Sequence, residues 1–575
     1  MKYLDILKIN KSLLDELKEQ DVYEVCILSN ITVSQIKEII EFKSRVEGVN
    51  THVHFGDYDN IVKDSFDNNN DCVIIFWELD NIVDEFGYKF DSINESQMIL
   101  LEEQVKCSIE LVFNNLSKVP VVFFNMFDPL FCEKFIENNN PILDFANRLN
   151  KFLSNIVPTN TTLIDIKSIK SISSNKKSID YRFYNISKSL YTVDFFINYA
   201  NYITPAILSL NGKTKKALIF DCDNTLWGGV IGEDGIDNIK MSNNGEGRFY
   251  REVQYLTKAL VKKGVIVGLC SKNDLDDVDR VFKTHKDMVL TDSDISIKKV
   301  NWKDKVENII SISKDLNIGL DSIVFIDDSN FEINNIVDRL PDISVFKVPD
   351  KIYKYPAIFR ELTSLFYSHS VSDEDKNKTN FYTTDIARKN KRNSYKDITM
   401  YLKSLNLTLN VYTDLISQVP RISQLTQKTN QFNLTTKRYS GEDIKKFISS
   451  DNYKVYTFDL SDNFGSYGLT GLCIIELLDN CVYIDSFLMS CRVIGRNVEY
   501  NFVYFVINSL LEQGFCEFYS SYKKTEKNKQ VEKFWEKIGF KLHEIENDGK
   551  FKYKLLKKNY NDHQLDYITI NKYEK

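Results

Sequence analysis

Short apolar runs alternate with amphipathic helical patterns over the first 205 residues. The runs have the length of buried strands, and they lie at 22–28, 72–76, 119–124 and 162–166. Apolar residues recur with helical spacing between them, as at 33–42 and 96–113. This alternation predicts an α/β domain with a mainly parallel sheet, which we place at residues 1–205.

The same alternation returns in a second stretch, at residues 213–365. Its predicted strands and helices follow one another in the order 217–220, 248–263, 265–270, 303–316 and 322–326. The pattern is typical of a doubly wound, Rossmann-like sheet, which carries its functional site at the carboxyl ends of the strands.

A charged segment with few apolar residues follows, and it predicts a polar helical connector at 366–404. Beyond the connector the order of elements changes, because strand patterns come first and helical patterns follow. The strands are expected at 405–412, 453–461, 471–478 and 480–488, and the helices at 495–513 and 528–538. This order predicts an α+β domain at 405–560. The polar residues 561–575 are expected to form a frayed tail.

Composition narrows the class of protein. The 575 residues carry a formal net charge of −7, so no general attraction to nucleic acid or to an anionic membrane is expected. No stretch of 18 apolar residues occurs, and charges interrupt the first 20 residues, so we expect neither a membrane span nor a signal peptide. The function is therefore sought among enzymes and binding proteins of the cytoplasm.

Cysteine and histidine usage agrees with that location. The ten cysteines form no CxxC pair, and several lie inside apolar runs, as buried reduced thiols do. The six histidines show no clustering along the sequence. From this spacing we expect no zinc site.

Acidic residues follow the first strand of the second domain. Asp221 comes directly after ALIF, and Asp223 and Thr225 follow at intervals of two. Period-two alternation places both carboxylates on one side of the chain. A nucleophilic carboxylate and a nearby second acid are the groups that phosphoryl transfer through a covalent intermediate requires.

The later strands of this domain supply the remaining polar groups. Ser271 ends the second strand, Lys305 lies in the first turn of a helix, and Asp327 and Asp328 end the strand SIVFI. Carboxylates at two strand ends favour hard Mg²⁺, while serine and lysine favour a phosphoryl group.

The order DxDxT, strand-final Ser, Lys and strand-final DD resembles the haloacid dehalogenase superfamily. The resemblance implies that Asp221 is the nucleophile and that Asp223 acts first as an acid and then as a base. The residues implied to bind the phosphoryl group are Thr225, Ser271 and Lys305. Those implied to hold Mg²⁺ are Asp221, Asp223 through its carbonyl, Asp327 and Asp328.

Longer strings are similar to the FkbH-like proteins over about residues 210–545. They are DCDNTLWGGVIGEDG, NWKDK, SIVFIDDSNFE, QLTQKTNQFNLTTKRY, FGSYGLTG and CRVIGRNVE. The resemblance implies a small phosphorylated substrate and transfer of a glyceryl or related acyl unit from an acyl phosphate, such as 1,3-bisphosphoglycerate, to an acyl carrier protein. A cysteine would carry the acyl group as a thioester, and Cys222 is the candidate nearest in sequence to the aspartates. Alternation turns Cys222 toward the core instead, and it favours the same for Cys270.

The turn after the fourth predicted strand of the third domain resembles the acyl-CoA-binding turn of the Gcn5-related acetyltransferases. The resemblance implies that CoA or phosphopantetheine binds here, and its candidate contacts are Arg492, Gly495, Arg496, Asn497 and Asn528. Asn497 replaces the usual small residue of that turn. The amide-rich run at 424–439 is either a set of caps and turns or a polar binding surface.

For the first domain, an esterase-like (SGNH-like) fold is expected from the family resemblance alone. It has no Gly-Asp-Ser string, and His52 and His54 fit no catalytic order, so a partner-binding role is favoured there. Three functions stay open for the chain. They are acyl transfer to a carrier protein, simple phosphatase activity on a sugar phosphate or similar metabolite, and non-enzymatic scaffolding.

Overall fold

The computed structural model describes residues 2–66, 68–82, 93–130, 141–173, 175–367, 384, 388, 392, 395, 397–525, 527–546 and 549–573. Its chain divides into two compact units, Met1–Asn211 with Ser440–Glu442, and Gly212–Tyr439 with Asp443–Lys575. Most of the predicted polar connector lies outside the described residues.

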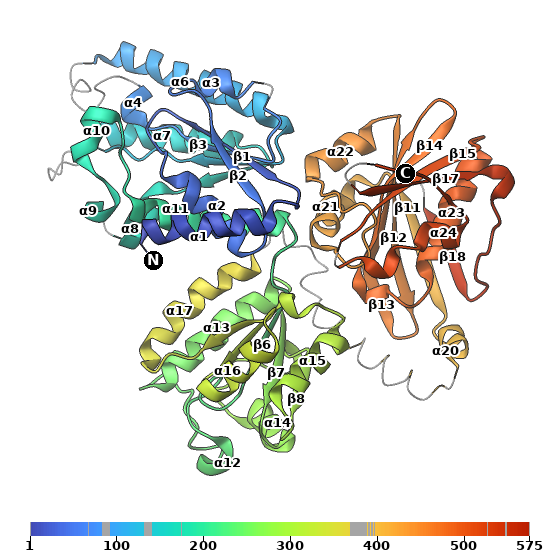
Figure 1. Ribbon diagram of the computed structural model, residues 1–575. Coiled ribbons are helices and arrows are strands. Elements are labelled where there is room, and N and C mark those ends of the chain that lie inside the picture. Colours follow the sequence, from blue (N-terminus) through green and yellow to red (C-terminus); the bar gives the residue numbers. More distant parts are fainter. Residues whose placement is uncertain are drawn as a thin grey trace. The chain divides into compact units, whose positions relative to one another are not determined.

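A five-stranded parallel sheet in the order β2-β1-β3-β4-β5 forms the centre of the first unit (Figure 1). Its strands are β1 (Tyr23–Ser29), β2 (Thr51–Phe55), β3 (Cys72–Phe76), β4 (Val121–Asn125) and β5 (Thr161–Ile164). The longer helices are α1 (Tyr3–Leu17), α2 (Ile36–Val46), α6 (Glu95–Asn115), α7 (Pro141–Ile156), α8 (Ile166–Ser173), α10 (Tyr181–Ser187) and α11 (Val193–Leu210). Single turns form α3 (Ile61–Asp64), α4 (Leu79–Ile82) and α9 (Asn175–Ser178).

Helices cover both faces of this sheet. Ile109 of α6 and Phe145 of α7 are in one apolar cluster with Val73 of β3 and Phe124 of β4. Helices α2 and α11 lie side by side, away from α6 (Figure 1). Every residue of β3 is buried, which explains its unbroken apolar sequence. The predicted α/β domain is confirmed.

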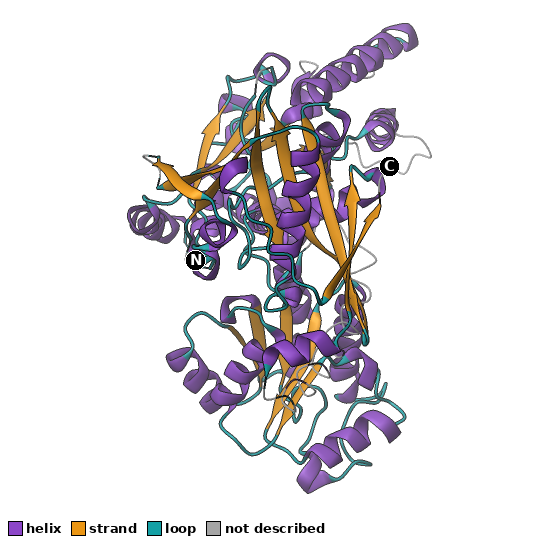
Figure 2. Ribbon diagram, turned by 90° about the vertical axis from the view of Figure 1, so that its right-hand side faces the viewer, coloured by secondary structure: helices purple, strands orange, loops and turns teal. Residues whose placement is uncertain are grey.

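The second unit begins with another five-stranded parallel sheet, in the order β10-β9-β6-β7-β8. Its strands are β6 (Ala217–Phe220), β7 (Ile266–Ser271), β8 (Ile297–Val300), β9 (Ile323–Asp327) and β10 (Ser344–Lys347). Its helices are α12 (Ile231–Asp234), α13 (Gly247–Lys262), α14 (Leu275–Thr284), α15 (Lys305–Leu316), α16 (Asn330–Arg339) and α17 (Tyr355–Leu362). Helices lie on both sides of these strands in the lower part of Figure 2.

Strand β6 contributes alternate residues to two cores, one on each face of this sheet. Leu218 and Phe220 belong to one apolar cluster, and Ala217 and Ile219 belong to the other. Because β6 is central, its carboxyl end lies between those of β7 and β9. The residues that follow these three strands therefore meet at one edge, as the doubly wound pattern predicts.

The carboxyl-terminal part of the second unit contains an eight-stranded mixed sheet in the order β16-β17-β15-β14-β13-β12-β11-β18. The strands are β11 (Leu407–Thr413), β12 (Tyr453–Asp462), β13 (Gly465–Leu477), β14 (Cys481–Met489), β15 (Glu517–Lys523), β16 (Lys541–Ile545), β17 (Lys550–Leu556) and β18 (Ile568–Tyr573). The helices are α20 (Ile398–Ser404), α21 (Val419–Lys428), α22 (Gly441–Ser449), α23 (Val498–Glu512) and α24 (Phe534–Ile538). The predicted α+β domain is confirmed.

The predicted frayed tail was wrong. Strand β18 pairs in parallel with β11 and extends the sheet, and Ile568 is buried. The short alternation of Ile568 and Ile570 was too weak a signal among polar neighbours for a strand to be expected. Within the described ranges, no helix has the length and apolar character needed to cross a membrane.

Candidate functional site

The strand ends of the second unit bring the predicted polar residues together. Asp221 follows β6 directly, and its backbone N–H donates to the carbonyl of Ile326 in β9 at 2.9 Å. Asp327 is the last residue of β9, and Ser271 is the last residue of β7. The predicted gathering of these side chains is confirmed.

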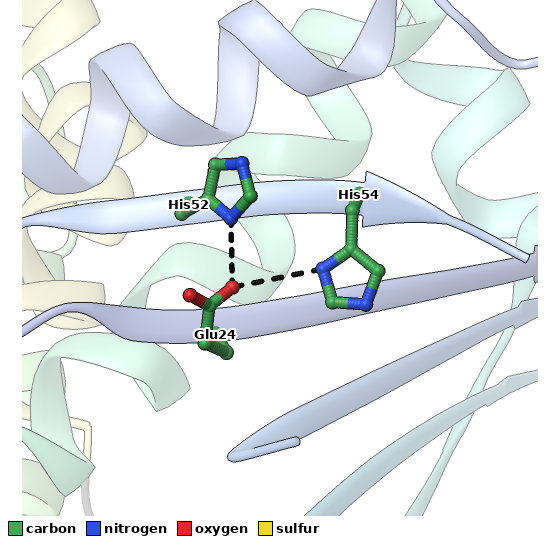
Figure 3. A group of neighbouring side chains, drawn as sticks. All are labelled: Glu24, His52 and His54. Atoms are coloured by element: carbon green, nitrogen blue, oxygen red, sulfur yellow. Dashed lines mark hydrogen bonds and ion pairs between the residues drawn. The ribbon is translucent and has the colours of Figure 1, made fainter. Parts of the chain in front are cut away.

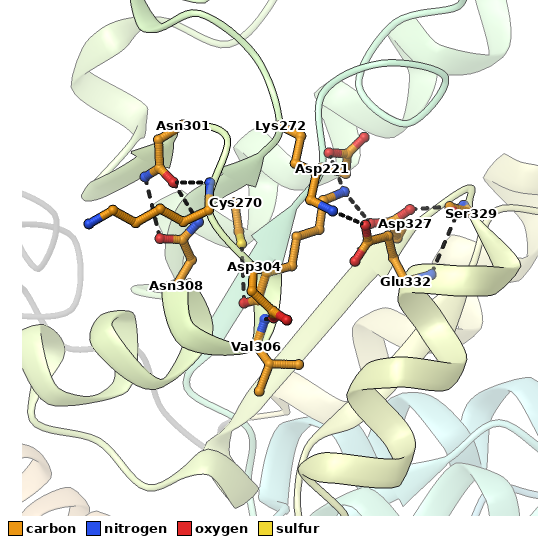
Figure 4. Close-up of polar contacts among 12 residues, drawn as sticks. Asp221, Cys270, Lys272, Asn301, Asp304, Val306, Asn308, Asp327, Ser329 and Glu332 are labelled. Carbon is orange, nitrogen blue, oxygen red and sulfur yellow. Dashed lines mark hydrogen bonds and ion pairs between the residues drawn. The ribbon is translucent and has the colours of Figure 1, made fainter.

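Lys305 joins two of the acids. Its Nζ lies 2.8 Å from Asp221 Oδ1 and 2.6 Å from Asp327 Oδ2. Lys305 is the first residue of α15, where the Asp304 side chain accepts from the Val306 N–H at 2.7 Å and caps the helix. Figure 4 shows Asp221 and Asp327 facing one another across this contact.

The cluster is buried and carries more negative than positive charge. Asp221 is 5% exposed and Asp327 is 0% exposed, and carboxylate oxygens of Asp221, Asp327 and Asp328 lie within 4.8 Å of one another. Burial raises the pKa of Asp221 to about 7, while the charge and hydrogen bond of Lys305 oppose the rise and Asp327 adds to it. A bound divalent cation would relieve this repulsion, and the ligands offered are oxygens, which Mg²⁺ prefers.

The turn after β6 holds the second aspartate. Asn224 has a left-handed φ of 52°, which asparagine tolerates, and its Oδ1 accepts from the Gly229 N–H at 2.9 Å. Asp223 then accepts three hydrogen bonds. The donors are Trp227 Nε1 at 2.9 Å, the Ile231 N–H at 3.1 Å and Asn273 Nδ2 at 3.0 Å.

Asn273 is a site residue that sequence reasoning missed. Its Nδ2 also lies 3.2 Å from Ser271 Oγ, so one amide links Asp223 to the serine at the end of β7. Asn273 is two residues after Ser271, and period-two spacing at a strand end could have indicated it. Trp227 gave no comparable signal, because its contact depends on how the turn folds back.

The proposed phosphate-binding residues differ in their surroundings. Ser271 and Lys305 both contact Asp221, and they lie among the acids. Thr225 is fully buried, and its Oγ1 has no hydrogen-bond partner among the described residues. A buried hydroxyl without a partner is unusual, and it leaves one donor of the DxDxT turn unassigned.

Neither thiol beside the acids is accessible. Cys222 is 0% exposed and packs in the apolar cluster that contains Phe220 and Trp227. Burial raises its pKa well above the usual thiol range, and burial also raises the pKa of Cys270 to about 12. The core position predicted for both is confirmed, and the burial of Cys222 disfavours a thioester there.

The candidate CoA-binding turn precedes α23. Gly495 has a φ of 84° and Asn497 a φ of 62°, so both adopt left-handed backbone. Glycine adopts this conformation freely because it has no side chain, and asparagine tolerates it. Arg496 Nη1 donates to the Arg492 carbonyl at 2.7 Å, and Asn497 Nδ2 donates to Tyr567 Oη at 3.1 Å. These side chains hold the turn itself in this structure.

Asn528 is a structural residue, which corrects its assignment as a ligand contact. It is 0% exposed, and its Nδ2 donates to the carbonyls of Asn433 and Lys523 at 2.9 Å each. Its Oδ1 accepts from the Thr525 N–H at 2.8 Å and from Tyr522 Oη at 3.1 Å. All the hydrogen-bonding capacity of the amide is thus used by the chain.

The amide-rich run at 424–439 fills a gap in the third sheet. Strands β14 and β15 pair only from Cys481–Glu517 to Ile484–Ser520 and then part. The Leu434 N–H donates to the β14 carbonyl of Phe487 at 3.1 Å, and the β15 N–H of Lys523 donates to the Leu434 carbonyl at 2.8 Å. Two interpretations were left open for the run, and the structural one holds for its central part.

The chain resembles a solved structure over 62% of its length. That structure is the N-terminal part of the protein BF1531 from Bacteroides fragilis, which contains a phosphatase domain and was crystallised as a complex with Mg. The alignment covers 62% of this chain and 99% of that one, with 25% identity and a TM-score of 0.54.

Other structural matches cover about a quarter of the chain. They include the ribosomal-protein-S18-alanine N-acetyltransferase from Escherichia coli, at 11% identity and a TM-score of 0.21 over 26% of this chain and 93% of that one. A putative acetyltransferase of the GNAT family from Desulfovibrio desulfuricans matches at 9% identity and a TM-score of 0.22, over 26% of this chain and 98% of that one. Similarity this low carries no functional conclusion. No family model and no curated protein matches the chain.

Proposed function

We propose that the chain is a Mg²⁺-dependent phosphoryl-transfer enzyme that works through an aspartyl-phosphate on Asp221. The observation that carries the proposal is the buried contact of Lys305 with Asp221 and Asp327 at the strand ends. The likeness to a phosphatase-domain protein complexed with Mg supports the same class of reaction.

The residues present fit a magnesium ion. Asp221, Asp327 and Asp328 supply three carboxylates against the single positive charge of Lys305, so the cluster has a net negative charge that a cation would balance. The Asp223 carbonyl is the fourth proposed ligand. When bound, the ion neutralises the repulsion between a carboxylate nucleophile and a phosphoryl group.

The proposed reaction has two halves. In the first, a carboxylate oxygen of Asp221 attacks phosphorus, the bond to the leaving oxygen breaks, and Asp223 gives that oxygen a proton. In the second, water attacks the same phosphorus, Asp223 takes a proton from the water, and phosphate leaves with the carboxylate of Asp221 restored. Lys305 and Ser271 donate hydrogen bonds to the phosphoryl oxygens.

The finer proposal concerns the substrate, an acyl phosphate such as 1,3-bisphosphoglycerate. Its phosphomonoester suits the reaction at Asp221. At its acyl phosphate, a thiol sulfur would attack the acyl carbon and form a thioester. The bond between that carbon and the phosphate oxygen would break, and the thiol proton would pass to the leaving phosphate. Because Cys222 and Cys270 are buried, we propose that this thiol belongs to the phosphopantetheine of an acyl carrier protein, with the turn at 492–497 as its binding site.

One incubation separates this proposal from its alternatives. The protein is mixed with 1,3-bisphosphoglycerate, Mg²⁺ and a phosphopantetheinylated carrier, and every protein species is weighed by mass spectrometry while phosphate release is followed. A glyceryl thioester on the carrier supports acyl transfer. Phosphate release without a thioester supports the simple phosphatase on a sugar phosphate or similar metabolite. If neither product forms and sugar phosphates are not hydrolysed either, the result supports the non-enzymatic scaffold.

Asn273→Ala is expected to lower kcat for a phosphomonoester such as p-nitrophenyl phosphate by roughly 10- to 100-fold, with KM changed much less. Asp223 loses one of its three donors and is no longer linked to Ser271. Steady-state kinetics and a thermal melt together provide the measurement. If kcat falls only because the variant is less stable, as a lowered melting temperature would show, a positioning role for Asn273 is contradicted.

A further inference from the structure

In the first unit's sheet, the edge strand β2 and its neighbour β1 bring two histidines and a glutamate together (Figure 3). His52 and His54 are two residues apart on β2, so their side chains point to the same face. Glu24 of β1 is in register with His52. On the opposite face of β2, Thr51 and Val53 are fully buried, which fixes the outward direction of both rings.

The ligand atoms of the three side chains converge. His52 Nδ1 lies 2.8 Å and His54 Nδ1 lies 3.6 Å from the same Glu24 Oε2. Each of the three side chains offers one ligand atom, and these ligand atoms lie within 4.8 Å of one another. Atoms that bind a tetrahedral ion at about 2.0–2.2 Å are separated by about 3.2–3.6 Å. The observed spacing therefore brackets that of a metal site.

The surroundings hold one of the three ligands in place and leave the cluster open to solvent. The Asp71 carboxylate accepts from the Glu24 N–H at 2.8 Å and holds the backbone of that ligand in place. The three side chains are 39–48% exposed, so a fourth coordination position would open to solvent.

We propose that Glu24, His52 and His54 form a binding site for a divalent transition-metal ion of the Zn²⁺ type. Imidazole nitrogens with one carboxylate suit such borderline ions, whereas the all-oxygen cluster at Asp221 suits Mg²⁺. The ion would cross-link the edge strand β2 to β1 and keep one position for water or for a ligand atom of a partner. This proposal runs against the expectation, drawn from the sequence, that the chain has no zinc site. It is independent of the proposed phosphoryl-transfer site.

The test uses the full-length protein, stripped with a chelator and then kept in excess Mg²⁺ so that the acidic cluster is saturated. Co²⁺ is titrated while the visible d–d absorption is recorded, and Zn²⁺ is then added to displace it. The variants are His52→Ala, His54→Ala and Glu24→Gln. The matched control is His543→Ala, which removes an exposed histidine on another strand.

Wild type and His543→Ala are expected to show a saturable d–d band that Zn²⁺ abolishes. Both of the other histidine variants should weaken Co²⁺ binding by about 100-fold or more, and Glu24→Gln should weaken it by about 10-fold or more. Zn²⁺ should raise the thermal midpoint of wild type and of the control but not of these three variants. No band in wild type, or an equal band in His52→Ala and His54→Ala, would overturn the proposal.

Discussion

Asp221→Asn is expected to reduce turnover of p-nitrophenyl phosphate by about 10⁴-fold or more, because an amide cannot attack phosphorus. Asparagine has the same shape as aspartate, and its carbonyl oxygen can still accept the hydrogen bond from Lys305. The fold should therefore survive the change. Steady-state rates in saturating Mg²⁺ and a far-ultraviolet circular dichroism spectrum provide the two measurements.

Asp237→Asn is the matched control, since Asp237 is an exposed aspartate of the same domain. Its rate should equal that of wild type within about twofold, because surface substitutions of this kind rarely disturb a site. If Asp221→Asn retains the wild-type rate, covalent catalysis at Asp221 is excluded, and with it the proposed phosphoryl-transfer reaction.

Lys305→Met should destabilise the metal-free protein by about 3–5 kcal/mol, because it leaves buried carboxylates without their cation. Asp221 and Asp327 each lose a short ion pair, and both are almost completely buried. Removal of the lysine also raises the pKa of Asp221 further, since the charge of Lys305 opposes the effect of burial. Differential scanning calorimetry without Mg²⁺ measures the loss, and added Mg²⁺ should restore part of it.

Lys299→Met provides the comparison for this experiment. Lys299 pairs with Asp315 at 2.7 Å, but the two side chains are 27% and 35% exposed, so the change should cost less than about 1 kcal/mol. Equal losses of stability in the two variants would show that the buried cluster does not depend on Lys305 for its charge balance.

The acidic site was predictable because parallel strands place their carboxyl ends at one edge. Asp221, Ser271 and Asp327 each stand at the end of an apolar run, and the topology of a doubly wound sheet then determines that they meet. Trp227 was not predicted, since its contact with Asp223 arises only after the turn has folded back. Asn273, which also bonds to Asp223, was missed although its spacing from Ser271 could have indicated it.

The histidine site could not be predicted from the sequence for a different reason. His52 and His54 are 28 and 30 residues from Glu24, and only the register of β1 against β2 brings them together. Spacing along the chain cannot reveal such a cluster unless the pairing of the strands is known. The same holds for Leu434, whose backbone bonds to β14 and β15 explain a run that composition alone left open between two interpretations.

The central claim is that Asp221 carries the phosphoryl group, and trapping that intermediate tests it most directly. The protein is mixed with p-nitrophenyl phosphate and Mg²⁺, quenched in acid, treated with hydroxylamine and digested, and the peptides are sequenced by mass spectrometry. A hydroxamate is expected at Asp221, and it should be absent without substrate and absent in Asp221→Asn. A hydroxamate at another carboxylate, or none at Asp221 while substrate is turned over, would contradict it.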